Sequence, residues 1–101
     1  MRDWCTTRSG ERFSERPIEE VWQKAQGVPG SRTQRVDVCG ATMERDQYGQ
    51  QTAHGWEIDH VIPVSRHGTD DLDNLQPLHW RNNRSKGDEI GAKQTWCHIT
   101  R

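Results

Sequence analysis

The sequence predicts a small α+β fold that contains an N-terminal helix, a β-hairpin, and a strand–loop–strand–helix unit in its second half. Three observations favour this class. Apolar residues recur with a helical period near the N-terminus. They alternate with polar residues in later segments. Gly and Pro divide the second half into pieces of strand and helix length. No repeat or linker divides the 101 residues, so we expect one domain over residues 1–101.

A helix is predicted over residues 17–26. Its apolar residues recur at i, i+3, i+4 and i+7: Ile18, Val21, Trp22 and Ala25. Pro17 suits the first turn of a helix, and Gly27 suits its end. The apolar face of this helix is therefore expected to pack on the core.

The hairpin is predicted to follow. Val36 and Val38 alternate with polar neighbours up to Cys39, and Gly40 then indicates a turn. Residues 42–45 suit the second strand of the pair. The polar stretch 46–55, which contains Gly49 and Gly55, is predicted to be a connecting loop.

The second half carries the clearest alternation. Residues 56–62 predict a strand with Trp56, Ile58, His60 and Ile62 on one face and Glu57, Asp59 and Val61 on the other. Pro63 is expected to end it. A loop rich in aspartate leads to a short return strand over 75–78, broken by Pro77. Residues 81–91 suit a short helix that stops near Gly87.

Composition limits the possible classes of protein. Hydrophobic residues make up 30% of the chain and charged residues 29%, so the core must rely on a few large side chains. Five tryptophans are available: Trp4, Trp22, Trp56, Trp80 and Trp96. The 14 basic and 15 acidic residues give a net charge of -1. A strongly basic nonspecific nucleic-acid binder is excluded, and any phosphate contact must be local.

The three cysteines, Cys5, Cys39 and Cys97, are far apart and form no C-x-x-C pair. Neither a disulfide framework nor a four-cysteine zinc site is predicted, and we expect reduced thiols. No apolar stretch is long enough for a membrane span, and the N-terminal residues lack the pattern of a secretory signal. A soluble cytoplasmic protein with no membrane partner is expected.

Three segments carry the candidate chemistry: WEIDHVIP, DDLDNLQPL and NNRSKGD. They gather five polar residues around one strand–loop–strand–helix unit: Asp59, His60, Asn74, Asn83 and Lys86. This pattern resembles the HNH endonuclease family, in its small bacterial or phage type, over residues 56–88. The preceding IEEVWQKA and CGA-x-M-x-R-x-x-YG are also similar. The resemblance implies the ββα-metal fold, preceded here by the helix and hairpin.

The resemblance also implies residue roles. Asp59 and Asn83 would hold one divalent cation, His60 would be the general base, and Asn74 would tether the loop that positions His60. The chemistry of these groups agrees, because imidazole accepts a proton near neutral pH. A carboxylate and an amide oxygen suit Mg²⁺ or Mn²⁺ and leave positions for water and phosphate.

Further roles are predicted around this set. Arg81, Arg84 and Lys86 would contact the nucleic-acid backbone, and His79 would be a neighbour of the metal ligands or an extra ligand. Many HNH proteins hold a structural zinc with two C-x-x-C pairs. Here those positions read Cys39 to Thr42 and His79 to Asn82, so no structural zinc is expected.

The predicted function is endonucleolytic hydrolysis of DNA, by nicking or cleavage, with targeting through a homodimer or a partner protein. Two alternatives remain open: a non-catalytic nucleic-acid-binding module of the same fold, and a nuclease acting on RNA or single strands. Taken alone, His60 would be a core histidine, and the aspartates at 70, 71 and 73 would be a solvated loop. The tryptophans are assigned mostly to the core.

Overall fold

The structure is a computed structural model that describes residues 5–90 and 95–100. The helices and strands run in the order α1 (Glu15–Trp22), β1 (Gln26–Gly27), β2 (Gln34–Val36), β3 (Thr42–Glu44), β4 (Trp56–His60), β5 (Leu75–His79) and α2 (Trp80–Lys86). Single 3₁₀ turns lie between them at Arg45–Gln47, Val64–Arg66 and Leu72–Asn74. The predicted α+β class and the ββα order of its second half are confirmed.

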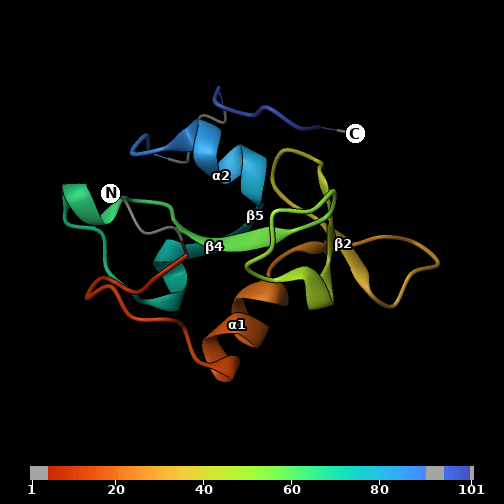
Figure 1. Cartoon of the computed structure of the whole chain (residues 1–101), viewed down its shortest axis with the longest axis horizontal. Helices are drawn as coiled ribbons and strands as arrows, with labels where there is room; N and C mark the ends of the chain where they lie inside the picture. The colour runs from red at the N-terminus through yellow and green to blue at the C-terminus, as the bar shows by residue number, and fades with distance from the viewer. Residues whose placement is uncertain (1–4, 91–94, 101) are drawn as a thin grey trace.

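The centre of the molecule is the antiparallel pair β4 and β5. Its register places His60 opposite Leu75 and Ile58 opposite Pro77. In Figure 1, α2 lies above this pair and α1 below it, so each face of the pair has a helix. This explains why Glu57 and Asp59 are buried along with the apolar face of the strand.

Two strand predictions differ from the structure. β4 ends at His60 rather than at residue 62, because Asn74 takes over the backbone hydrogen bonds from Val61 onward. β5 continues through Pro77 instead of breaking there. A two-stranded sheet leaves one side of each strand unpaired, so the missing N–H of Pro77 costs no ladder hydrogen bond on that side.

α1 begins two residues before the prediction and ends at Trp22, four residues before it. Ala25 nevertheless packs against the core, because a turn follows the helix. In this turn the N–H of Ala25 donates to the carbonyl of Trp22 at 3.1 Å. Pro17 lies in the first turn, where its lack of an N–H is tolerated. α2 stops before Gly87, as predicted, and that glycine has a positive φ of 55°.

The hairpin forms as β2 and β3, with β1 added at the edge of β2. β2 ends at Val36, earlier than predicted, because Asp37 begins a tight turn. The Oδ1 atom of Asp37 accepts the N–H groups of Cys39 and Ala41 at 3.0 and 2.9 Å. These side-chain hydrogen bonds replace the strand ladder at this point.

One apolar cluster joins α1, β3, β4 and β5: Phe13, Ile18, Val21, Trp22, Met43, Trp56, Ile58 and Leu75. The rings of Trp22 and Trp56 lie 4.9 Å apart between centroids. Trp96 is also buried, Trp80 is half-buried, and Trp4 lies outside the described residues. Within the described ranges, no helix is long and apolar enough to cross a membrane.

The expectation of reduced thiols is wrong for two of the three cysteines. Cys39 and Cys97 form a disulfide between Cα atoms 5.7 Å apart. Their separation of 58 residues in sequence hid the pairing, since connectivity between distant cysteines cannot be deduced from spacing. Cys5 is free and its thiol donates to the hydroxyl of Tyr48 at 2.8 Å. Burial raises the pKa of the Cys5 thiol to about 11.

Candidate active site

A cavity of about 390 Å³ opens where β4 ends beside α2. Asp59, His60 and Asn83 all line it. Successive residues of a regular strand point to opposite faces. Asp59 and His60 share one cavity because His60 is the last residue of β4, where the regular pleat ends. The rest of the wall is formed by the N-terminal segment, by residues 63–65 and by Asp88.

Asp59 is buried, with 4% of its surface exposed. Its Oδ1 lies 3.1 Å from the ammonium of Lys86, and its Oδ2 accepts a hydrogen bond from the amide of Gln76 at 2.9 Å. Burial raises the pKa of the Asp59 carboxyl, and the positive charge of Lys86 opposes that rise. The carboxylate is thus fixed in direction by two neighbours, and its remaining lone pairs can serve another partner.

Lys86 shares the face of α2 that carries Asn83, as predicted, but that face is buried. Only 1% of the residue is exposed. Its ammonium also donates to the backbone carbonyl of His60 at 2.9 Å. One side chain therefore holds both the carboxylate of Asp59 and the backbone of His60. These internal partners favour a supporting role over the expected contact with a phosphate.

Asn83 is held by Glu57, a second buried carboxylate of β4. Its Nδ2 donates to Oε1 of Glu57 at 2.9 Å, and Oε2 of Glu57 accepts from Arg84 at 2.9 Å. Because the amide nitrogen is bound to a carboxylate, the oxygen Oδ1 is the atom of Asn83 that remains for a further ligand. Glu57 was assigned no role from the sequence, and its place two residues before Asp59 was the only available signal.

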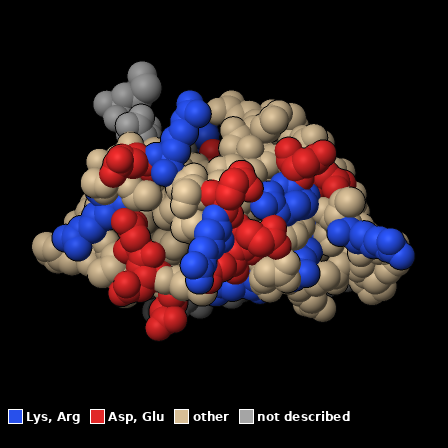
Figure 2. All heavy atoms as spheres, turned by 90° about the horizontal axis from the view of Figure 1, so that it is seen from below, with Lys and Arg blue, Asp and Glu red and all other residues tan. Residues whose placement is uncertain are grey.

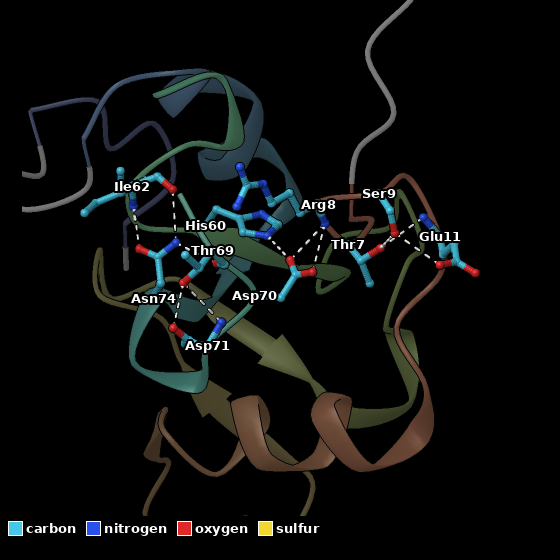
Figure 3. Close-up of polar contacts among 10 residues, drawn as sticks. All are labelled: Thr7, Arg8, Ser9, Glu11, His60, Ile62, Thr69, Asp70, Asp71 and Asn74. Carbon is cyan, nitrogen blue, oxygen red and sulfur yellow. Dashed lines mark hydrogen bonds and ion pairs between the residues drawn. The ribbon is translucent and has the colours of Figure 1, made fainter. Parts of the chain in front are cut away.

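The imidazole of His60 contacts a carboxylate from the loop between β4 and β5. Its Nε2 lies 2.8 Å from Oδ1 of Asp70. Both oxygens of Asp70 also accept the backbone N–H of Arg8, at 2.8 and 3.1 Å. Figure 3 shows Asp70 between the histidine ring and the N-terminal segment. The three aspartates are exposed, as expected for a solvated loop, but Asp70 also contacts the imidazole and the amide of Arg8.

Asn74 closes the loop, as its predicted tethering role requires. Its Oδ1 accepts the N–H of Ile62 at 2.8 Å, and its Nδ2 donates to the carbonyls of Ile62 and Thr69 at 3.1 and 2.9 Å. Its own carbonyl accepts the N–H of Val61 at 2.8 Å. The chain that leaves His60 is thereby fixed on both sides of the loop (Figure 3).

His79 lies at the other end of β5 and does not line the cavity. Its Nδ1 accepts the N–H of Arg81 at 3.1 Å and caps α2. Its Nε2 lies 2.8 Å from the carbonyl of Ala53. Because Nδ1 accepts, Nε2 is the nitrogen that carries the proton. The geometry assigns His79 to holding the helix start rather than to the metal ligands.

Two of the three expected basic residues lie beside one aromatic ring. The guanidinium groups of Arg81 and Arg84 lie 4.9 and 5.7 Å from the centre of a Trp80 ring. Arg81 is exposed, and Trp80 and Arg84 are half-buried. Figure 2 shows basic and acidic side chains interspersed over the face it presents, in agreement with the near-zero net charge.

The donor set fits a hard divalent cation. Asp59 supplies a carboxylate and Asn83 an amide oxygen at the wall of one cavity. Among the described residues, no group of three or more His, Cys, Asp or Glu side chains could hold a metal. A site on this pair would therefore leave most coordination positions to water and to phosphate oxygens, which is how Mg²⁺ is commonly bound.

Comparison with known proteins gives one match. The sequence model of the HNH endonuclease family matches residues 37–89, which is more than half of the chain. The match spans β3, β4, β5 and α2, together with every predicted metal-ligating and catalytic residue. No curated protein and no protein of solved structure matches this chain.

Proposed function

Because this chain belongs to the HNH endonuclease family, a family of nucleases that act on nucleic acids, we propose that it is a divalent-metal-dependent enzyme that hydrolyses phosphodiester bonds of DNA. The observation that carries the proposal is the shared cavity of Asp59, His60 and Asn83. These are the groups that the reaction needs at one place: a base and two hard oxygen ligands.

In the proposed reaction, His60 accepts a proton from a water molecule that attacks phosphorus. Asp59 and Asn83 would hold one Mg²⁺ or Mn²⁺ ion, which when bound neutralises charge on the phosphate and on the departing 3′ oxygen. Lys86 keeps the carboxylate and the backbone of His60 in place. Asn74 fixes the loop that follows the base.

The nucleic-acid backbone would meet the exposed side of α2. Arg81 and Arg84 lie against the Trp80 ring there, and guanidinium groups are suited to phosphate oxygens. The ring limits the freedom of both side chains, which lowers the entropy lost on binding. Lys86 is not part of this contact, because its ammonium is buried.

The test is cleavage of a supercoiled plasmid with Mg²⁺, Mn²⁺ or excess EDTA. We expect relaxed or linear product with either cation and none with EDTA. The variant His60→Ala should lose on the order of 100-fold or more in rate, because the general base is removed. His54→Ala is the matched control, since His54 is exposed and lies outside the cavity wall, and it should cleave like the wild type.

Other outcomes overturn the proposal in distinct ways. Binding to DNA without cleavage under any cation would indicate a non-catalytic module of the same fold. Faster cleavage of RNA or of single-stranded DNA in a parallel assay would indicate a different substrate. Equal rates for His60→Ala and wild type would remove His60 as the base.

A further inference from the structure

An N-terminal hairpin, residues 5–12, forms one wall of the cavity although it lies outside the residues that match the family. Thr6 pairs with Arg12, and Thr7 donates to the carbonyl of Glu11 at 2.7 Å. The N–H of Gly10 closes a turn onto the carbonyl of Thr7 at 2.9 Å. The hairpin is thus an ordered element beside His60 and Asp59.

A chain of contacts runs from this hairpin to the imidazole. The backbone N–H of Arg8 donates to both oxygens of Asp70, and Oδ1 of Asp70 meets Nε2 of His60 at 2.8 Å (Figure 3). A backbone N–H cannot change rotamer, so it fixes the carboxylate more firmly than a mobile side chain would. Because a carboxylate only accepts hydrogen bonds, Nε2 must be the protonated nitrogen of the neutral ring.

We propose that Asp70 is a positioning residue for His60, and that the N-terminal hairpin holds Asp70 through the amide of Arg8. The inference rests on the proposed function, in which His60 is the base. Asp70 selects the tautomer that carries the proton on Nε2, which leaves Nδ1 as the atom that takes the proton from water. It also fixes the direction of the ring, as an orienting carboxylate does for other catalytic histidines.

The exposure of the pair separates this role from a merely structural one. The side chain of Asp70 is 40% exposed and that of His60 is 11% exposed. Because the Asp70 carboxylate is open to solvent, water can take over the hydrogen bonds lost on its removal, so these contacts contribute little to stability. Loss of the carboxylate should therefore leave the melting temperature nearly unchanged, whereas a role in positioning predicts a large loss of rate.

The first experiment compares three variants in the plasmid assay. Asp70→Ala should lower kcat on the order of 10- to 100-fold with little change in KM. Asp70→Asn should recover part of the loss, because its amide oxygen still accepts hydrogen bonds. Asp73→Asn is the matched control, since Asp73 lies in the same loop, carries the same charge and is exposed; it should behave as wild type.

The second experiment reads the ring directly by ¹⁵N NMR of His60 in the metal-free protein at about pH 8.5, where histidine is normally neutral. Wild type should show the Nε2–H tautomer, and Asp70→Ala a mixture. Arg8 occupies the second position of its turn, where proline is favoured. Arg8→Pro removes the amide donor and should shift the tautomer signal, whereas Arg8→Ala keeps the donor and should not.

The two experiments distinguish a failure of the positioning role from a failure of the proposed function. A wild-type protein that cleaves nothing would end the proposed function, but the tautomer signal would still show whether Asp70 controls the ring. A pure Nε2–H signal in Asp70→Ala, or an unchanged kcat in that variant, would overturn the positioning role. A fall in melting temperature that matches the loss of rate would assign Asp70 a structural role instead.

Discussion

At the scale of single residues, the buried pair of Asp59 and Lys86 is the most consequential contact. Both side chains are almost fully enclosed, and their charged atoms lie 3.1 Å apart. Two charges in such a place are tolerated only together, because each alone would lose its hydration without compensation. The pair therefore fixes the end of β4 to α2 at the point where His60 follows.

The first prediction concerns this pair. Lys86→Met should lower the free energy of unfolding by about 3 to 5 kcal/mol, because it leaves the carboxylate of Asp59 buried and unpaired. The double variant Asp59→Asn with Lys86→Met should recover much of that loss, since neither charge then remains. Urea unfolding of the metal-free proteins measures both values. A double variant as unstable as Lys86→Met would show that packing, and not charge, dominates.

At the scale of elements, Asp37 joins the β2–β3 turn to the start of α2. Its Oδ2 accepts the N–H of His79 and the amide of Asn82 at 3.0 and 2.9 Å, while Oδ1 holds its own turn. A buried carboxylate and its hydrogen bonds thus connect these two segments.

The second prediction follows from those hydrogen bonds. Asp37→Ala should lower the free energy of unfolding by on the order of 3 kcal/mol, because several buried N–H groups lose a charged acceptor at once. Asp46→Ala removes an exposed carboxylate from a nearby turn and should change stability by less than about 0.5 kcal/mol. Thermal and urea unfolding of both variants provide the comparison, and equal effects would contradict the role of Asp37.

At the scale of the whole molecule, the disulfide between Cys39 and Cys97 links the hairpin to the C-terminal segment. That segment also contacts α2 directly. The side chain of Asn82 accepts the N–H groups of His98 and Ile99 at 2.8 and 2.6 Å. A covalent bond thus joins residues 58 positions apart, and hydrogen bonds hold the same C-terminal segment against α2.

The third prediction tests this link by counting thiols. The folded, unreduced protein should react with no thiol reagent at about pH 8, because the pKa of Cys5 is about 11 and the thiol form is unreactive. Unfolding without reductant should expose one thiol, and reduction should expose three. Reduction should also lower the free energy of unfolding by about 2 to 4 kcal/mol. Three thiols before reduction would contradict the disulfide.

The local pattern of the sequence predicted much of the fold. The helical period at Ile18, Val21 and Trp22 and the alternation after Trp56 predicted α1 and β4, and Gly87 predicted the end of α2. The boundaries moved where hydrogen bonds from a side chain replaced those of the strand ladder. Asp37 ended β2 through its own side chain, and Asn74 ended β4 from fourteen residues away.

The strand, loop and helix that carry Asp59, His60 and Asn83 follow from local patterns, because periodicity and turn chemistry act between near neighbours. The groups that surround these side chains depend instead on how distant segments pack. Asp70 and the amide of Arg8 meet across 62 residues, and Cys39 meets Cys97 across 58. Such pairs depend on how the elements pack, and no local spacing records them. The same reason explains why Lys86, which follows Asn83 on one helix face, proved to be buried beneath the site.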